Sequence, residues 1–139
     1  MSGHIPAHLV RQVRERAGDA CEYCRVPQAS QEATFHVNHI VPRLLGGTTT
    51  ADNLALACVS CSLRKSARVT AQDPADGKDV PLYHPRKDEW RRHFAMSADY
   101  RIEGRSPVGR ATIEALGMNR PAIVAIRREL HLLGRLDLR

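Results

Sequence analysis

Four cysteines form two identical pairs whose spacing suits a metal ion. The pairs are Cys21-x-x-Cys24 and Cys58-x-x-Cys61, and they account for every cysteine in the chain. A two-residue spacing lets both thiolates of a pair point at one ion, and four thiolates complete the tetrahedral shell of zinc. Such a zinc has no open position, so it would be structural and coupled to folding. The pattern predicts a structural Zn²⁺; four ordinary buried thiols and a redox Cys-x-x-Cys are the alternatives.

The stretch "FHVNHIVPRLLGG", residues 35–47, lies between the cysteine pairs and holds two histidines and an asparagine. Its β-branched and aromatic residues predict a strand that Pro42 ends. On a strand, His36 and Asn38 would face one side while His39 faces the other. Neutral imidazole is the usual group for accepting a proton near pH 7, and His39 at the strand's end could reach a water. His39 is therefore a candidate general base, with polar surface as the alternative role of a lone histidine.

The composition is that of a small globular protein with a thin core. The chain has 139 residues, of which 42% are hydrophobic but only 4% aromatic. A core with so few large rings gains from a metal staple. The formal net charge of +6 is compatible with a polyanionic partner such as nucleic acid.

No segment of the sequence predicts export or membrane insertion. No apolar run approaches the roughly 18–20 residues that span a bilayer, and the N-terminus "MSGHIPAHLV" lacks a charged-then-apolar signal. We therefore expect a soluble cytoplasmic protein with no membrane partner. Cysteines stay reduced in that compartment, which favours a metal site over disulfides.

A first helix is predicted over residues 5–20, because Pro6 suits an early helical position and Gly18 a helix end. Apolar residues recur every four positions at Leu9, Val13 and Ala17. Three arginines lie largely off that stripe and are interpreted as a solvated face: Arg11, Arg14 and Arg16. After the histidine stretch, residues 54–69 predict a short strand or turn and then a short helix. Residues 72–81 predict a turn-rich connector with a hairpin tip.

The remaining chain is expected to be rich in helices. Residues 84–96 predict a helix and residues 99–106 a strand. A helix over 106–119 would be capped by Ser106 and opened by a proline. A last helix over 119–136 would have Asn119 as its cap and an apolar stripe made of Ile123, Ile126, Leu130 and Leu133. We predict two units: a zinc-bound core, residues 1–72, and an α-rich C-terminal extension packed on it, residues 73–139.

The segments "CEYC", "FHVNHIVPRLLGGTTTADNLALAC" and "CSLRK", taken in order, closely resemble the HNH endonucleases, a family of ββα-metal nucleases. The shared pattern is a cysteine pair, His-Ile-x-Pro, Gly-Gly, Asn-Leu and a second cysteine pair followed by lysine. The segments "VPLYHPRKDEW" and "SPVGRATIEALGMN" look like the C-terminal extension of one bacterial branch of the family. The resemblance implies an α+β fold: a zinc-stapled, treble-clef-like ββα-metal core with an N-terminal helix and an α-rich extension.

The resemblance also implies hydrolysis of phosphodiester bonds in DNA with one divalent cation, Mg²⁺ or Mn²⁺, with Ni²⁺ as a further choice. His39 would be the general base, and Asn53 would hold the loop between the strands so that His39 is aimed. Four basic residues flanking the proposed centre are candidate phosphate contacts, with solvated surface as the alternative: Arg43, Arg64, Lys65 and Arg68. A homodimer would suit cutting of both DNA strands, although the sequence leaves the oligomeric state open.

Two positions depart from the family pattern. Asn38 stands where the family usually has an acidic residue or histidine as a metal ligand, and Ser62 where it usually has asparagine or histidine. Neutral oxygens bind Mg²⁺ less strongly than carboxylates, so His36 is a candidate nitrogen ligand that would favour Mn²⁺, Ni²⁺ or Zn²⁺. These departures keep two alternatives open: a weakened or inactive DNA-binding module, and a zinc-stabilised interaction protein.

Overall fold

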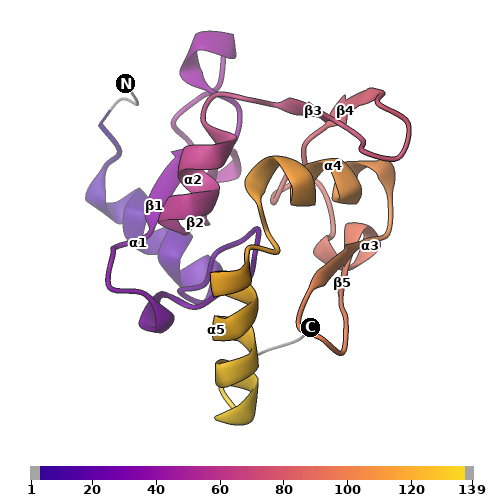
Figure 1. The fold of residues 1–139 in the computed structure, drawn as a ribbon. Helices are drawn as coiled ribbons and strands as arrows, with labels where there is room; N and C mark the ends of the chain where they lie inside the picture. Colours follow the sequence, from indigo (N-terminus) through magenta and orange to yellow (C-terminus); the bar gives the residue numbers. More distant parts are fainter. Residues whose placement is uncertain (1–3, 137–139) are drawn as a thin grey trace.

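A computed structural model describes residues 4–136 and shows short helices combined with antiparallel strand pairs (Figure 1). Strand β1, His36–His39, pairs with β2, Leu54–Ala57. Helix α2, Val59–Lys65, follows β2 directly, and α1, Ala7–Arg16, contacts β2. The predicted α+β fold class is confirmed. None of the helices described is long and apolar enough to cross a membrane.

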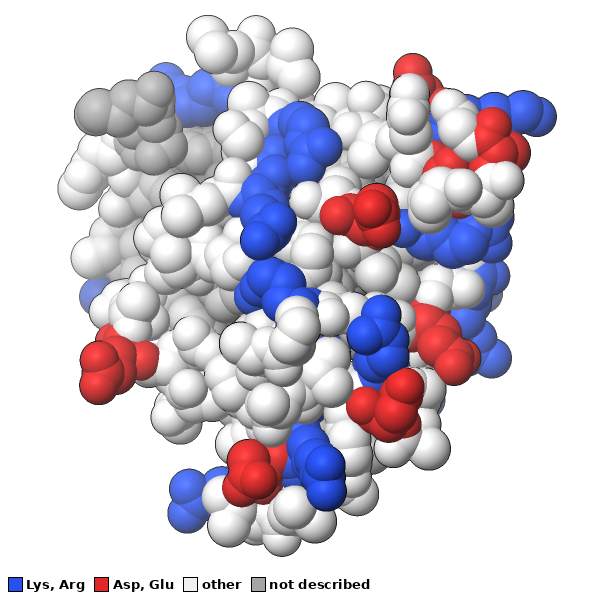
Figure 2. Space-filling view, viewed as in Figure 1, with Lys and Arg blue, Asp and Glu red and all other residues white. Residues whose placement is uncertain are grey.

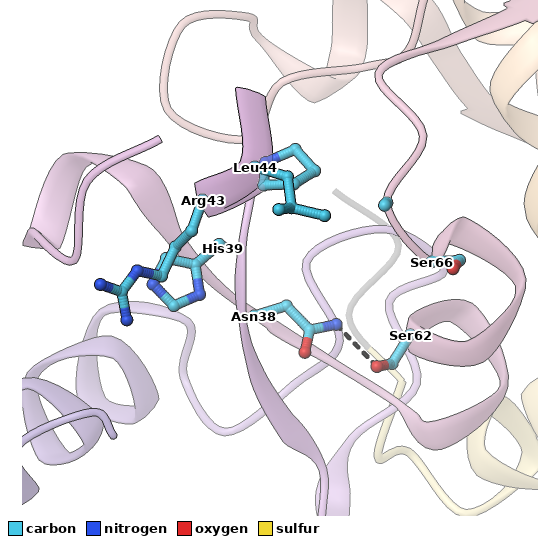
Figure 3. A pocket seen from close by; sticks show the side chains of 8 residues that line it. Asn38, His39, Arg43, Leu44, Ser62 and Ser66 are labelled. Carbon is cyan, nitrogen blue, oxygen red and sulfur yellow. Dashed lines mark hydrogen bonds between the residues drawn. The ribbon is translucent and has the colours of Figure 1, made fainter. Parts of the chain in front are cut away.

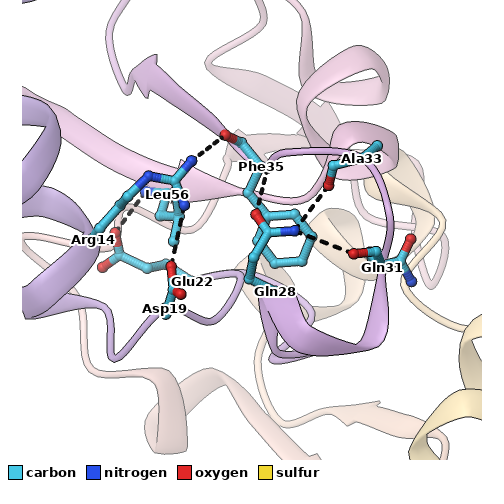
Figure 4. Close-up of polar contacts among 8 residues, drawn as sticks. All are labelled: Arg14, Asp19, Glu22, Gln28, Gln31, Ala33, Phe35 and Leu56. Carbon is cyan, nitrogen blue, oxygen red and sulfur yellow. Dashed lines mark hydrogen bonds and ion pairs between the residues drawn. The ribbon is translucent and has the colours of Figure 1, made fainter.

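Helix α1 begins two residues later than predicted, at Ala7, and Pro6 occupies the N-cap. Its buried Val13 packs into the core. The interpretation of its arginines as a solvated face is wrong for Arg14, which is partly buried, whereas Arg11 and Arg16 are exposed. Arg14 donates to the Phe35 carbonyl at 2.9 Å and to Asp19 (Figure 4), and Arg16 donates to the Leu54 carbonyl at 2.7 Å. These side chains satisfy carbonyls at the edges of the β1–β2 pair, which helix periodicity cannot reveal.

The segment between α1 and β1 is held by side chains that take the place of regular secondary structure. Gln28, in the short 3₁₀ helix Gln28–Ser30, accepts from the Phe35 amide at 2.7 Å and donates to the Ala33 carbonyl at 2.9 Å (Figure 4). Glu22 accepts from the Leu56 amide at 2.8 Å. The polar loop is thereby tied to the start of β1 and to the middle of β2.

The β1–β2 pair is joined by a loop that contains two 3₁₀ turns, Arg43–Leu45 and Ala51–Asn53. The register sets Val37 opposite Leu56 and His39 opposite Leu54. All four residues of β2 are buried, so this strand forms the centre of the core. The exposed start of β1 and its buried end at His39 place the histidine stretch between core and solvent.

Residues 66–136 form two further strand pairs and three helices (Figure 1). The elements are β3, Thr70–Gln72; β4, Asp79–Pro81; α3, Trp90–His93; β5, Phe94–Met96; β6, Ile102–Gly104; α4, Pro107–Leu116; and α5, Pro121–Leu132. The hairpin tip predicted within residues 72–81 and the strand within 99–106 are confirmed. Ser106 caps α4 as predicted, because its hydroxyl accepts from the Gly109 amide at 2.9 Å.

Three predictions for this region are wrong. Only Trp90–His93 is helical within residues 84–96, because the His84 ring accepts from the Arg86 and Lys87 amides in a preceding turn. Residues 94–96 form a strand instead, paired with residues 102–104. Asn119 does not cap α5, because its carbonyl oxygen accepts from the Ile102 amide at 2.7 Å. Leu133 is 65% exposed and lies outside the apolar stripe of α5.

The C-terminal segments pack against the turn that carries the first cysteine pair. The Trp90 indole donates to the Tyr23 carbonyl at 2.9 Å, and Arg86 forms a buried ion pair with Glu22. Arg127 of α5 donates to the Cys24 carbonyl at 3.3 Å. Three consecutive residues after Cys21 are thus held by side chains from later in the chain. The division into units at residue 72 stays a prediction.

Candidate active site and cysteine cluster

The four cysteines lie together in the core, which confirms their predicted clustering. Their sulfur atoms are all within 4.8 Å of one another, and each cysteine is buried. The Sγ atoms of Cys24 and Cys58 are 3.7 Å apart. Zn–S bonds of about 2.3 Å in a tetrahedron place two sulfurs about 3.8 Å apart, whereas a disulfide needs about 2.05 Å. The geometry therefore fits one tetrahedral metal ion.

Tight backbone turns bring each pair of cysteines together. In the first turn, the Arg25 amide donates to the Cys21 carbonyl at 3.0 Å, and Arg25 has a positive φ of 72°. In the second, Cys58 is the N-cap of α2 and its sulfur accepts from the Cys61 amide at 3.4 Å. Backbone donors aimed at sulfur favour the thiolate that metal binding requires.

A pocket of about 250 Å³ opens where β1, the following loop and α2 meet (Figure 3). Its lining includes Asn38 and His39, two residues of β1 that belong to the predicted catalytic centre. The lining residues are Asn38, His39, Pro42, Arg43, Leu44, Ser62, Ser66 and Ala67. No aspartate or glutamate is among these residues. The pocket therefore offers neutral oxygens, an imidazole and one guanidinium.

His39 is largely enclosed, with 8% of its surface exposed. Its Nε2 atom lies 2.8 Å from the Thr49 hydroxyl. In the tautomer whose Nε2–H donates to Thr49, Nδ1 is the nitrogen that accepts a proton. Burial, followed by the nearby charge of Arg43, lowers the pKa of His39 from its ordinary 6.5. Both effects favour the neutral ring that a general base needs.

Asn53 holds the loop that carries the pocket wall. Its carbonyl oxygen accepts from the Val41 amide at 2.9 Å, while its Nδ2 donates to the Val41 and Thr48 carbonyls at 3.0 and 2.8 Å. A Cβ at Gly47 would lie 1.8 Å from the Val41 carbonyl oxygen, so only glycine allows this close approach. The loop between Val41 and Asn53 is thus clamped at its base, next to His39.

The three residues predicted to bind a catalytic metal come together at one hydroxyl. Asn38 Nδ2 donates to Ser62 Oγ at 2.7 Å (Figure 3). His36 Nδ1 lies 2.8 Å from the same oxygen. His36 and Asn38 therefore share one face of β1, as strand alternation predicts. Their meeting with Ser62 required the docking of α2 against β1, which the sequence does not specify.

The four predicted phosphate contacts separate into different environments. Arg43 lines the pocket, while Arg64 and Arg68 are exposed on α2 and just after it. Lys65 is only 2% exposed and donates to the Ile40 carbonyl at 2.8 Å. Its ammonium joins α2 to the end of β1 and is not available to a phosphate in this structure. Lys65 is therefore not among the proposed DNA contacts.

These features define a class of protein: a small α+β core in which a four-cysteine cluster supports an antiparallel strand pair and a helix beside a histidine-bearing pocket. A family model described as HNH endonuclease matches residues 21–68, which include the cysteines, His39 and Asn53. This segment is therefore similar to the HNH endonucleases. No match was found among curated proteins or among solved structures.

Sequence reasoning missed three residues that support the site. Thr49 contacts His39, Trp90 holds Tyr23, and Arg127 holds Cys24. Thr49 had a local signal, since it lies between the Gly-Gly turn and Asn53. Trp90 and Arg127 had none, because their partners are 67 and 103 residues away.

Proposed function

We propose that this protein is a metal-dependent endonuclease that hydrolyses phosphodiester bonds in DNA, with His39 as the general base. The observation that carries the proposal is an enclosed imidazole, with a pKa lowered by burial, in the pocket of the segment that matches the HNH model, beside Asn38 and Ser62. His39 Nδ1 accepts a proton from the attacking water, and Thr49 orients the ring through Nε2. Asn53 keeps the loop beside His39 in place, so its role is orientation without proton transfer.

Two kinds of metal ion are part of this proposal. Cys21, Cys24, Cys58 and Cys61 hold a structural Zn²⁺. His36, Asn38 and Ser62 supply neutral donors for Mg²⁺, Mn²⁺ or Ni²⁺ at the pocket. Such a cation, when bound, stabilises the charge that develops on the phosphate and the leaving oxygen. A cytoplasmic location and a homodimer that cuts both strands stay predictions.

The test of the proposal is plasmid nicking by the wild type and by His39→Ala in Mg²⁺, Mn²⁺, Ni²⁺ or no added cation. We expect cation-dependent nicking by the wild type and a loss of about 10² in rate for the variant, because removal of a general base costs at least about that factor. The wild-type rate should also fall with decreasing pH, since protonation removes the base. The midpoint should lie below 6.5, because the pocket lowers the pKa of His39.

A matched His8→Ala variant controls for a contaminating nuclease, because His8 is exposed on α1, away from the pocket. It should nick like the wild type. Equal inactivity of the wild type and His39→Ala with every cation would remove the nuclease proposal.

A weakened or inactive DNA-binding module is the second candidate, and the absence of a carboxylate from the pocket lining favours it. The change Asn38→Asp tests this candidate. The Ser62 hydroxyl can donate to the new carboxylate, so the existing contact is kept. We expect half-maximal nicking at a cation concentration lower by about tenfold or more, since ligand charge shifts the affinity of oxygen sites by orders of magnitude.

Cation titrations of the nicking rate measure this effect, with Asn38→Ala as the control that adds no charge. If Asn38→Asp needs the same cation concentration for half-maximal nicking as the wild type, Asn38 does not contact the cation. Nicking by the aspartate variant alone would identify the natural protein as a weakened enzyme. Duplex binding without nicking in every variant would instead support the binding module.

A further inference from the structure

Three arginines from separate segments meet at the C-terminal end of α4. Arg68 Nη2 donates to the Ala115 carbonyl at 3.1 Å, and Arg120 Nη1 donates to the Gly117 carbonyl at 2.6 Å. A Cβ at Gly117 would lie 3.1 Å from Nε of Arg64, so this guanidinium packs on the same turn. We call Arg64, Arg68 and Arg120 the arginine cluster. It joins α2, the end of α4 and the start of α5.

The arginine cluster carries positive charge that no ion pair balances in the part of the chain that the structure describes. None of its members forms an ion pair within residues 4–136, although Asp79 and Glu114 line a hollow shared with Arg68. The positive charge of Arg68 also acts on the neighbouring Lys65. Burial is the larger cause that lowers the pKa of Lys65 to about 8, and the charge of Arg68 is the second. Three adjacent like charges repel one another, so an anionic partner would stabilise this arrangement.

The capping of α4 does not require three arginines. Gly117 adopts the left-handed conformation with a φ of 58°, and the Met118 amide already donates to the Ile113 carbonyl at 3.1 Å. The carbonyl contacts use one terminal nitrogen each of Arg68 and Arg120, while Arg64 uses only Nε, on Ser60. The other guanidinium nitrogens of the cluster remain as donors that main-chain contacts have oriented. This arrangement suits phosphate oxygens.

The arginine cluster lies on a different side of α2 from the pocket. Ser62 and Ser66 line the pocket, whereas Arg64 is two residues farther along and therefore about 200° around the helix from Ser62. Figure 2 shows basic side chains gathered in a column near the middle of one face, where Figure 1 places α2 beside α4 and the start of α5. None of the three arginines of the cluster lines the pocket. The cluster would therefore contact other phosphates of the same substrate.

We propose that Arg64, Arg68 and Arg120 form a second phosphate-binding site that holds the DNA backbone away from the cleavage pocket. The inference rests on the proposed function for the identity of the polyanion as DNA. It adds a contribution from the C-terminal segment through Arg120, and it separates binding of the duplex from hydrolysis in the pocket.

The test is the salt dependence of duplex binding, measured by fluorescence anisotropy with a labelled DNA duplex and without added divalent cation. Each phosphate neutralised contributes about −0.9 to the slope of log Kobs against log salt concentration. We expect the triple variant Arg64→Gln/Arg68→Gln/Arg120→Gln to have a slope less steep by about 2.7, and each single variant by about 0.9.

A triple variant with the same change in net charge is the matched control. Arg11, Arg91 and Arg128 are exposed on α1, α3 and α5, outside the cluster, and their replacement by glutamine should leave the slope unchanged. The His39→Ala variant should also keep the wild-type slope, because His39 lies in the pocket. Circular dichroism reports whether the triple variant folds, and the single variants give the result if it does not.

The outcomes separate this inference from the nuclease proposal. Cluster variants with the wild-type slope, or with the same change as the control triple, overturn the inference even if the wild type nicks plasmid. A duplex RNA of equal length is the second arm, and a slope change confined to RNA also overturns the assignment to DNA. The expected slope change in a protein that never nicks supports the second phosphate site and removes the nuclease proposal.

Discussion

The Cys61→Ser variant, like the wild type stripped of metal by a strong chelator, is expected to lose its cooperative fold. Cys61 is fully buried within the cluster, and a serine hydroxyl is a poor replacement for a thiolate ligand. Structural zinc contributes about 10–16 kcal/mol of binding free energy in small metal-dependent domains, more than the total stability of most domains. The measurements are metal content by mass spectrometry and thermal unfolding followed by circular dichroism.

The control for this prediction is Ser60→Ala, on the same helix and directly before Cys61. Within residues 4–136 its hydroxyl accepts only from Arg64, at 3.3 Å, so we expect wild-type metal content and a nearly unchanged midpoint. The wild type should contain one metal ion per chain. A metal-free Cys61→Ser protein with the wild-type unfolding transition would show that the cysteines are ordinary core residues.

The Arg127→Met variant is expected to be less stable by about 3–5 kcal/mol, the usual cost of breaking a buried charge pair. Arg127 is 0% exposed, and its guanidinium donates to the Met118 carbonyl at 2.6 Å and the Tyr100 carbonyl at 3.0 Å, besides Cys24. It forms no ion pair with an acidic residue in the described part of the chain. Methionine fills much of the volume but leaves these carbonyls without a donor.

The charge of Arg127 has a partner only if the cysteines are thiolates. Burial lowers its pKa, whereas the charges of Cys24, Cys61 and Cys21 act in the opposite direction. Four thiolates around one Zn²⁺ carry a net charge of −2, since four negative charges exceed the two positive ones. We therefore expect Arg127→Met to release zinc to a chelator faster than the wild type, in addition to its lower stability.

Two variants make this prediction specific. Arg128→Met removes the same charge from the next position, which is exposed, and should behave like the wild type. Arg127→Lys keeps the charge but loses the forked set of donors, so it should be intermediate. Stability and zinc release in Arg127→Met equal to those of Arg128→Met would show that α5 and the cysteine cluster are independent.

Short-range patterns in the sequence were sufficient for the chemistry-bearing segments. The two cysteine pairs, the alternation of His36, Asn38 and His39 along a strand, and the cap at Ser106 all depend on residues within four positions of one another. Spacing of this kind sets side-chain direction through the geometry of strands and turns. The cysteine cluster was predicted from the two pairs and the fold class from the resemblance to the HNH endonucleases, while the residue roles in the pocket remain predictions.

Polar residues with long-range partners were misjudged from sequence. Asn119 was predicted to cap a helix, but its side chain binds the Ile102 backbone. Lys65 was predicted to be a surface cation, but it is buried and donates to the Ile40 carbonyl. A buried carbonyl must find a donor, and any nearby long side chain can supply it. Which residue does so depends on how the elements dock, and no local pattern encodes that.

The sequence by itself determined that two cysteine pairs, a histidine strand and a short helix would occur in the order of an HNH core. Only the tertiary structure decided what surrounds them: Thr49 at His39, Arg127 at the cysteine cluster and three arginines at the end of α4. Local spacing constrains a metal-binding turn because its ligands are neighbours. Docking of α4 and α5 arises from burial of apolar surface, which is non-directional, so their polar contacts depend on the packed arrangement.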